Sequence, residues 1–333
     1  MKVAVLGSGG WGTALAMLLL GNGHQVKLWS HTGEESKRLE LTRENPLLPD
    51  ITLPSGLSYT CSLDCVTDCD VIVMATPSFA VRRTARDLKG LLKAGTVIVS
   101  VSKGIEKDTS LRLSQVIREE TGGEYPVAVL SGPSHAEEVA RKMPTGCVSA
   151  CEDRAVAEFV QDLFLNEYFR VYTSPDTIGV ELGAALKNVM ALCAGCCSGM
   201  GLGDNTKAML MTRGLTEVAR LGVALGGKRE TFAGLAGMGD LIVTCTSLNS
   251  RNNRAGILIG GGMAPEEAVS KIGAVVEGYF AVDSARTLAR RLGVEMPITE
   301  AAYRVLYEGA GMADMLKTLM LREKRHEVEE SWM

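Results

Sequence analysis

A glycine pattern near the start of the chain restricts the fold more than any other feature of the sequence. Gly7, Gly9 and Gly12 follow a short apolar segment, residues 2–6, and open an apolar stretch of helical length, residues 11–22. In a strand that turns directly into a helix, the first glycine permits the tight turn, the second lets the backbone approach a ligand, and the third lets helix and strand pack closely. Amides at the start of such a helix bind anions. The sequence therefore predicts a strand–turn–helix unit that holds the diphosphate of a dinucleotide.

The order of apolar segments in the first half of the chain agrees with this prediction. Strand-length runs alternate with helical stretches such as residues 79–92, as expected for parallel strands joined by crossover helices. After Ser174 and Pro175 such runs nearly vanish, and long stretches rich in Ala, Leu and Met follow. We therefore expect an α/β fold, with a Rossmann-type, mostly parallel sheet in residues 1–176 and an all-α domain in residues 177–333. The predicted strands are residues 2–6, 25–30, 57–61, 70–75, 96–101 and 127–131, with 146–150 and 169–173 closing the sheet.

Composition and charge exclude several classes of protein. The 333 residues are 46% apolar and 22% charged, which is typical of a folded protein, and the net charge of −4 gives no basic excess for binding nucleic acid. The longest apolar runs are shorter than the ~20 residues that span a bilayer, so we expect no membrane span. The nine cysteines are an odd number and lack the spacing of a zinc site. We expect free thiols in a cytoplasmic protein and no metal.

The end of the second predicted strand bears on the choice of dinucleotide. An NAD-specific site places an Asp or Glu there to bind the ribose hydroxyls, whereas this chain has Ser30, His31 and Thr32. Without an acid at that point a 2′-phosphate is not repelled, so we expect NADP to be accepted as well as NAD. The alternative is that His31 is only a loop residue, since Glu34 and Glu35 lie close by.

Two polar segments follow neighbouring strands. Lys103 comes after the fifth predicted strand, and residues 131–135, which include Gly132 and Ser134, come after the sixth. Open α/β sheets bind their ligands at the carboxyl ends of parallel strands, so both segments are expected at one cleft. The alternative for Lys103 is a solvated loop lysine.

Lys187 interrupts a helix that is apolar on nearly all faces. Leu182 to Leu186 precede it and Val189 to Leu192 follow Asn188, so the lysine is expected to be buried. Burial disfavours the charged form, and a lowered pKa suits a lysine to exchanging protons near neutral pH. The alternative is a lysine that reaches solvent or pairs with Glu181.

Further along, Asp240 follows a glycine-rich turn, and residues 250–254 are dense in Ser, Arg and Asn. Arginine offers a planar fork for phosphate, with Ser and Asn as neutral donors, so Ser250, Arg251 and Asn252 fit a phosphorylated small molecule. The alternative is an Asn- and Arg-rich solvent loop. Val275 and Glu277 by themselves indicate only a helix cap or a turn.

Together these segments resemble the bacterial NAD(P)-dependent sn-glycerol-3-phosphate dehydrogenases. The resemblance runs in order along nearly the whole chain, through GSGGWGTALA (7–16), VSKGIE (101–106), SGPS (131–134), ELGAALKNV (181–189), GDL (239–241) and SRN (250–252). Two positions depart from the family pattern. Gly10 stands where the family commonly has Ser, and Leu47 where it usually has Tyr.

The resemblance implies reversible reduction of dihydroxyacetone phosphate to sn-glycerol 3-phosphate with NADPH or NADH, a reaction that feeds glycerophospholipid synthesis. It implies that Lys187 is the proton donor and acceptor at the substrate C2 oxygen, with Lys103 and Asp240 beside it. The positions that match substrate contacts are Gly132, Ser134, Ser250, Arg251 and Asn252. Those that match cofactor contacts are Gly10, Trp11, His31, Lys103, Ala136, Arg251, Val275 and Glu277.

Two other functions remain open at this point. One is a related dehydrogenase with a Rossmann domain and a helical domain, which acts on a 3-hydroxy acid or on 6-phosphogluconate. Asp240 and the segment 250–252 favour a glycerol-3-phosphate dehydrogenase over this related enzyme. The other is a dinucleotide sensor without catalysis, which would have no need of a buried Lys187. A homodimer fits an apolar helical domain, although no stripe of residues identifies an interface.

Overall fold

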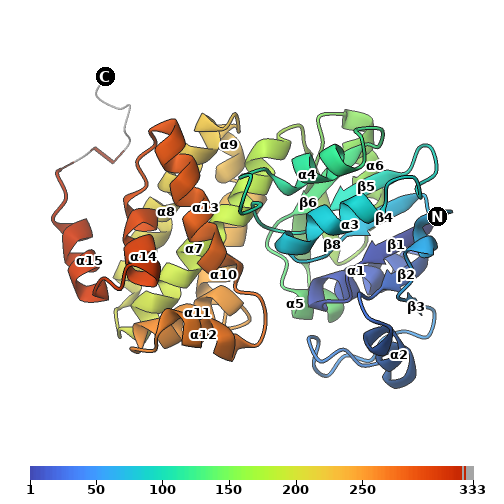
Figure 1. Cartoon of the computed structure of the whole chain (residues 1–333), viewed down its shortest axis with the longest axis horizontal. Helices are drawn as coiled ribbons and strands as arrows, with labels where there is room; N and C mark the ends of the chain where they lie inside the picture. The colour runs from blue at the N-terminus through green and yellow to red at the C-terminus, as the bar shows by residue number, and fades with distance from the viewer. Residues whose placement is uncertain (325, 328–333) are drawn as a thin grey trace.

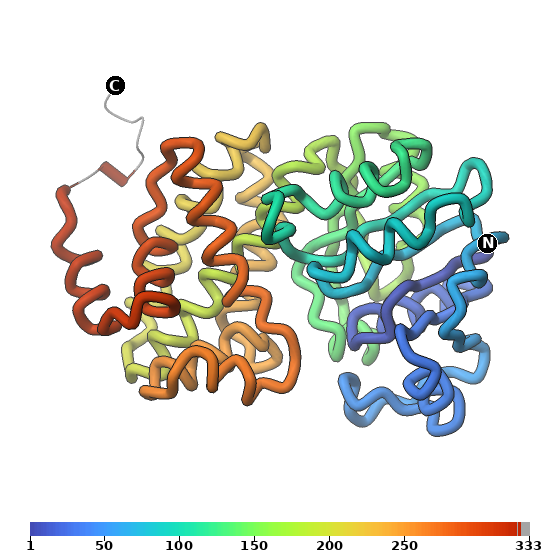
Figure 2. Tube along the Cα trace, in the orientation of Figure 1, coloured from blue at the N-terminus to red at the C-terminus, as the bar shows by residue number. Residues whose placement is uncertain are grey.

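A computed structural model describes residues 1–324, 326 and 327. Residue 325 and the last six positions of the predicted helical domain, 328–333, lie outside the described residues. The chain forms a sheet covered by helices at one end and a group of helices at the other (Figure 1). The N-terminus lies at the sheet end and the last described helix at the opposite end (Figure 2).

The N-terminal half is a Rossmann-type domain around one eight-stranded sheet. Its strand order is β3-β2-β1-β4-β5-β6-β7-β8, and all neighbouring pairs are parallel except β6 with β7. The chain therefore reverses direction before the last two strands, which close the sheet as expected. The strands are β1 (Lys2–Leu6), β2 (Gln25–Trp29), β3 (Ser58–Thr60), β4 (Val71–Met74), β5 (Val97–Ser100), β6 (Val127–Ser131), β7 (Thr145–Ala150) and β8 (Phe169–Ser174).

Helices cover both faces of this sheet. They are α1 (Gly10–Gly21), α2 (Gly33–Thr42), α3 (Val81–Asp87), α4 (Leu113–Glu120), α5 (Ala136–Ala140) and α6 (Arg154–Phe164), with short 3-10 turns η1 (Leu63–Val66) and η2 (Ser78–Ala80). The helix predicted over 79–92 is shorter than expected. It ends at Asp87, and Gly90 with φ 79° has left-handed backbone that does not continue a helix.

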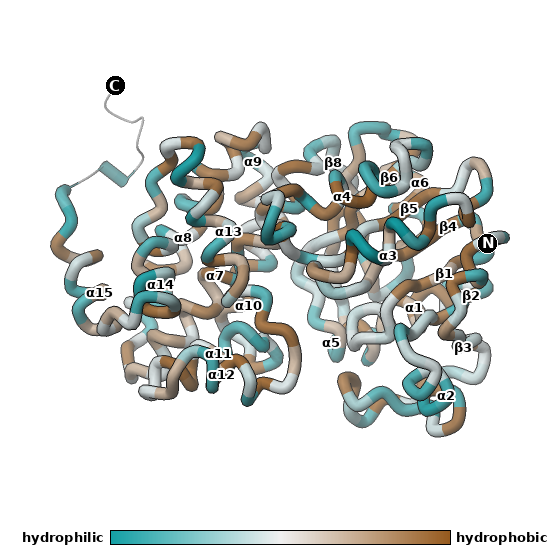
Figure 3. Tube along the Cα trace, in the orientation of Figure 1, coloured by the Kyte–Doolittle hydropathy of each residue, from teal (hydrophilic) through white to brown (hydrophobic). Residues whose placement is uncertain are grey.

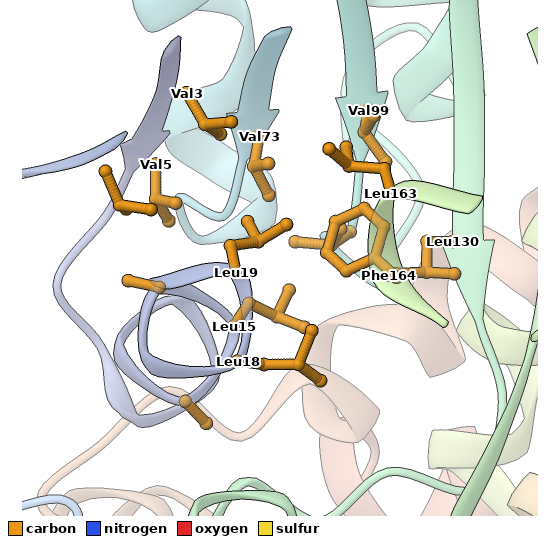
Figure 4. Close-up of a cluster of buried hydrophobic side chains, with 14 of the residues drawn as sticks. Val3, Val5, Leu15, Leu18, Leu19, Val73, Val99, Leu130, Leu163 and Phe164 are labelled. Atoms are coloured by element: carbon orange, nitrogen blue, oxygen red, sulfur yellow. The ribbon is translucent and has the colours of Figure 1, made fainter. Parts of the chain in front are cut away.

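Alternate residues of each strand pack into two separate cores. Val3 and Val5 of β1 face Leu15 and Leu19 of α1, in a cluster completed by α6 (Figure 4). Ala4 and Leu6 point to the other face, against α3 and α4. Because both faces are buried, the central strand β4 is apolar throughout and β5 is apolar up to its last residue, Ser100, whereas the outer helix α2 is largely hydrophilic (Figure 3).

The described part of the chain after β8 is helical. The helices are α7 (Thr177–Gly199), α8 (Asp204–Ala224), α9 (Arg229–Phe232), the π-helical turn η3 (Leu235–Gly239), α10 (Asp240–Thr246), α11 (Arg251–Gly260), α12 (Pro265–Ile272), α13 (Glu277–Leu292), α14 (Pro297–Tyr307) and α15 (Met312–Met320). α7 lies at the centre and packs against α8, α10, α11 and α13. It is long and apolar enough to cross a bilayer, but 83% of its most apolar window is buried inside the protein, as expected of a core helix.

α7 and α11 meet backbone to backbone. Gly195 and Gly199 of α7 alternate with Gly256 and Gly260 of α11 along the contact, and a methyl group on any of the four would collide with a carbonyl of the facing helix. This close approach fixes the distance between the two helices and brings the start of α11 next to the middle of α7.

Candidate functional site

The glycine turn, residues 7–12, has the shape that the sequence predicts. Gly7 has φ +124°, and a Cβ there would lie 2.6 Å from the carbonyl oxygen of Ala75; a Cβ on Gly12 would collide with the carbonyl of Gly7. Gly9 differs, because its Cβ would meet nothing within 4 Å. Gly9 is also the N-cap of α1 and supplies no side chain to the first-turn amides. The turn therefore presents free helix amides to an open space.

Buried polar atoms without partners lie along the same edge of the sheet. Trp11 Nε1, Ser30 Oγ after β2, Thr76 Oγ1 after β4 and Ser131 Oγ at the end of β6 have no hydrogen-bond partner among the described residues. Buried polar groups normally have a partner, so these atoms indicate a polar ligand at the carboxyl ends of the strands. Together with the open space at Gly9, they fit a dinucleotide placed where the strand order reverses between β1 and β4.

His31 lies at the expected end of the second strand. It is exposed, two residues after β2, with its ring centroid 6.0 Å from that of Trp29. Glu34 and Glu35 belong instead to the first turn of α2, where acidic side chains stabilise a helix N-terminus. Glu34 and Glu35, which left the prediction for His31 open, therefore have a local structural role in α2.

Lys103, Lys187 and Asp240 form the centre of the site, and with Thr244 we call them the lysine–aspartate cluster. Lys187 Nζ lies 2.5 Å from Asp240 Oδ1, and Lys103 Nζ lies 2.8 Å from Asp240 Oδ2. One carboxylate therefore binds two ammonium groups, one from α7 and one from the loop after β5. Glu181, the alternative partner of Lys187, is bonded to Arg112 and Ser114 instead.

Burial sets the protonation of this cluster. The side chains of Lys187 and Asp240 are 7% and 1% exposed, and that of Lys103 is 19% exposed. Desolvation lowers the pKa of Lys187 to about 8, against the opposing attraction of Asp240, and the charge of Lys103 lowers it further. Desolvation would raise the pKa of Asp240, but the two ammonium groups hold it below its ordinary value. The cluster thus contains an ionised carboxylate beside a lysine that can change protonation near neutral pH.

Sequence reasoning missed Thr244. Its hydroxyl accepts a hydrogen bond from Lys187 Nζ at 2.5 Å and donates to the backbone oxygen of Asp240 at 2.6 Å. Thr244 follows Asp240 by four positions, so the two side chains share one face of α10. That spacing would have indicated Thr244 had a helix been predicted from residue 240.

The loop after β6 contacts the cluster through Lys103. The ammonium of Lys103 donates to the carbonyl of Gly132 at 3.0 Å and lies 3.4 Å from Ser134 Oγ. Gly132 is confined, since a Cβ there would lie 2.7 Å from the carbonyl oxygen of Gly146. Both predicted strand-end segments therefore meet at one place, and Lys103 is not a solvated loop lysine.

The segment 250–252 is a helix start and not a solvent loop. Ser250 caps α11 by accepting a hydrogen bond from the amide of Asn253. Asn252 is buried, donates to Asn188 Oδ1 at 2.9 Å and accepts from the amide of Gly278 at 2.8 Å. Arg251 is exposed as a residue and has no hydrogen bond or ion pair among the described residues, while desolvation lowers the pKa of its guanidinium against the attraction of Glu277. The bond to Asn188, the neighbour of Lys187, brings the start of α11 near the lysine–aspartate cluster, and a helix N-terminus that carries an arginine suits an anionic ligand.

Glu277 does more than begin a helix. It is the first residue of α13, and its two carboxylate oxygens share the proton of one hydroxyl of the Rossmann domain, Ser78 Oγ, at 2.9 and 2.8 Å. Desolvation raises the pKa of Glu277, and the Ser78 hydrogen bonds oppose that rise. Val275 is half-buried just before it. Ser78 was not predicted, and nothing in the local sequence connects it to a residue 199 positions away.

Gly10 and Leu47, the two departures from the family pattern, are neighbours. A Cβ on Gly10 would lie 3.2 Å from the Leu47 carbonyl oxygen and 3.6 Å from the Cβ of Ala136. Gly10, Leu47 and Ala136 therefore enclose one side of the glycine turn, with Trp11 next along α1.

The Rossmann sheet, the open glycine turn and a lysine–aspartate cluster that includes Lys103 at the same edge of the sheet define a dehydrogenase that uses a nicotinamide dinucleotide. The family model for the N-terminus of NAD-dependent glycerol-3-phosphate dehydrogenase matches residues 2–157, and the model for the C-terminus matches residues 176–317. The chain belongs to the NAD(P)-dependent glycerol-3-phosphate dehydrogenase family.

Relatives of similar length support this assignment. The chain is 55% identical over 330 residues to glycerol-3-phosphate dehydrogenase [NAD(P)+] of Moorella thermoacetica, covering 98% of both chains, and 48% identical over 335 residues to that of Fusobacterium nucleatum, covering 100% of both. The crystal structure of glycerol-3-phosphate dehydrogenase from Coxiella burnetii is 38% identical, with a TM-score of 0.92 over 96% of this chain and 99% of that one. A ketopantoate reductase from Ralstonia eutropha, 16% identical with a TM-score of 0.63 over 95% of this chain and 100% of that one, shares the fold alone.

Proposed function

We propose that the protein reversibly reduces dihydroxyacetone phosphate to sn-glycerol 3-phosphate with NADPH or NADH, and so supplies glycerophospholipid synthesis. The observation that carries this proposal is the contact of Lys187 and Lys103 with one carboxylate, near the start of α11, where Asn252 bonds to Asn188 and Arg251 precedes it. The buried lysine suits a carbonyl that gains a proton, and the arginine suits a phosphate.

In this proposal Lys187 is the proton donor and acceptor. In reduction its ammonium stabilises the charge that develops on the C2 oxygen and then transfers a proton to it. In oxidation the neutral amine removes the proton from the hydroxyl. Asp240 and Thr244 orient Lys187 through the bonds described above, and the bound nicotinamide supplies or accepts the hydride.

We propose that the remaining polar residues hold the two ligands. Around the substrate phosphate and hydroxyls we place Lys103, Gly132, Ser134, Ser250, Arg251 and Asn252. Along the cofactor we place Gly7, Gly9, Gly10, Trp11, Gly12, His31, Lys103, Ala136, Arg251, Val275 and Glu277. The Rossmann domain, residues 1–176, would thus bind the cofactor, and residues 177–333 would carry most of the substrate chemistry.

One assay tests the reaction. Purified protein receives NADPH or NADH, and oxidation of the cofactor is followed on addition of dihydroxyacetone phosphate, a 3-keto acid or 3-keto-6-phosphogluconate. We expect turnover with dihydroxyacetone phosphate and a loss of at least ~100-fold in kcat for Lys187→Ala, the low end of a general acid's contribution. Lys207→Ala, at a surface pair with Asp204, is the matched control and should keep full activity. Absence of wild-type turnover with either cofactor would refute the proposal and favour a sensor.

We also propose that the protein acts in the cytoplasm as a homodimer. All nine cysteines are free thiols, which suits a reducing compartment.

α15 has no buried residue, and its apolar side chains line a cavity of about 470 Å³ with α7, α8 and α14, where Met209 and Met320 are exposed. A second copy would cover this face. Light scattering should give twice the chain mass, and Leu316→Glu should give a monomer; a monomeric wild type would refute the dimer.

A further inference from the structure

A loop outside the predicted site is fastened to the glycine turn by one side chain. Asn45 lies in the segment between α2 and β3 and is 4% exposed. Its amide nitrogen donates to the carbonyl oxygen of Ser8 at 2.9 Å and to Thr13 Oγ1 at 2.8 Å, and its amide oxygen accepts from the backbone of Leu47 at 3.0 Å. All these partners belong to the protein, so Asn45 has little capacity left to bind a ligand directly.

Thr13 completes the arrangement. Its hydroxyl accepts the hydrogen bond from Asn45 and donates to the same Ser8 carbonyl at 3.2 Å. Thr13 and Ser8 are 0% and 4% exposed. Two donors in a dry environment therefore hold the Ser8 carbonyl toward the protein interior.

The orientation of that carbonyl determines where the next amide points. In a planar trans peptide the C=O and the N–H point in opposite directions, and the chain has no cis peptide among its described residues. If the Ser8 oxygen points inward, the N–H of Gly9 points the opposite way, and the turn is open at this residue, since an added Cβ on Gly9 would meet nothing within 4 Å. The bonds that hold Ser8 thus aim the Gly9 amide at the predicted place of the diphosphate.

The loop that carries Asn45 is itself firmly anchored. Arg43 and Leu53 are joined by backbone and guanidinium hydrogen bonds at its base, and Leu48 and Leu53 are buried in the core under α1. The loop therefore holds Asn45 in a fixed position relative to the core.

We propose that Asn45, together with Thr13, is a positioning residue for cofactor binding, which fixes the Ser8–Gly9 peptide so that the Gly9 amide faces the dinucleotide diphosphate. The inference rests on the proposed cofactor site. It predicts that loss of Asn45 weakens every ligand that carries the diphosphate, by the same factor and without changing the chemistry at Lys187.

The test measures dissociation constants of NADPH, NADH and ADP-ribose by fluorescence or calorimetry, without substrate. Asn45→Asp keeps the size and the acceptor of the side chain but removes both donors, and we expect all three dissociation constants to rise at least about tenfold, with kcat at saturating NADPH changed less than about threefold. Thr13→Val should weaken binding in the same direction, and Thr13→Ser, which keeps the hydroxyl, should bind as the wild type does.

Asn166→Ala is the matched control. Asn166 donates to Asn22 Oδ1 and accepts from the amides of Tyr168 and Phe169, so it has the same kind of bonding in the loop before β8. We expect it to lower the melting temperature without changing the dissociation constants. If Asn45→Asp and Thr13→Val lower only the melting temperature, the inference is wrong. If the wild type binds none of the three ligands, the cofactor site itself is wrong.

Discussion

The glycine turn and the lysine–aspartate cluster are built from different parts of the chain. The turn is made of backbone: its shape comes from positions where a side chain does not fit, at Gly7 and Gly12, and its ligand groups are amides. The cluster is made of side chains: those of α7 and α10 meet when the helical half packs, and Lys103, from the loop after β5, joins them when the two halves of the molecule pack together. A backbone site is encoded locally, whereas a side-chain site depends on long-range packing.

The largest expected effect concerns the carboxylate of the cluster. Asp240→Asn leaves the buried ammonium of Lys187 and the half-buried one of Lys103 without a counter-charge, so we expect kcat to fall about 100-fold or more while the NADPH dissociation constant changes less than about threefold. Steady-state kinetics and fluorescence titration measure the two quantities. Asp204→Asn, in an exposed pair, is the control. A loss in kcat below tenfold would mean that the lysines do not depend on this partner.

In the glycine turn, a substitution can weaken cofactor binding without changing the stability of the fold. Gly9→Ala places a methyl group in open space at φ −62°, which any residue adopts, so the melting temperature should stay unchanged while the NADPH dissociation constant rises about tenfold. Gly7→Ala should lower the melting temperature and also weaken NADPH binding. At φ +124° and against the Ala75 carbonyl, the added methyl group strains the fold by about 1–3 kcal/mol. Unchanged NADPH binding in Gly9→Ala would show that the diphosphate does not bind at the glycine turn.

The pKa of Lys187 predicts opposite pH profiles for the two directions. Its folded value of about 8 lies below the ordinary 10.5, so the amine becomes neutral as the pH rises through 8. Between pH 7 and pH 8, kcat/KM for oxidation of glycerol 3-phosphate should rise about fivefold, and kcat/KM for reduction should fall by a similar factor between pH 8 and pH 9. Profiles that are flat between pH 7 and pH 9 would show that Lys187 does not titrate in catalysis.

The smallest expected effect lies at the exposed end of the cofactor site. His31→Glu places a carboxylate where a 2′-phosphate is expected, and two such charges in water interact by about 1 kcal/mol, so the KM for NADPH should rise at most about fivefold. The KM for NADH should not rise, since a carboxylate there can accept from the ribose hydroxyls, and the difference between the two cofactors should shrink at high salt. An equal effect on both cofactors would place His31 away from the 2′-phosphate.

The sequence allowed prediction of the turn, the eight strands and the burial of Lys187, because each depends on spacing or on hydrophobic pattern within one segment. It did not reveal Thr244, since the chain up to Asp240 suggested a turn and not the start of α10. The bond from Ser78 to Glu277 and the bonds from Asn45 to Ser8 join segments whose proximity follows only from the packed structure. The segment 250–252 had a composition typical of loops, and its asparagines are buried because α11 lies directly against α7.

The glycine contact between α7 and α11 also limits how the site can change over time. Each of its four glycines faces a carbonyl of the other helix, so no larger residue can enter at one position unless both helices shift together. Lys187 and Asn188 lie on one of these helices and Asn252 on the other, so the distance between these residues stays the same as long as the glycine contact is kept. New substrate preferences in such a chain are therefore expected to arise from the loops that carry Lys103 and Ser134, which lie outside this contact, while the spacing of the two helices stays the same.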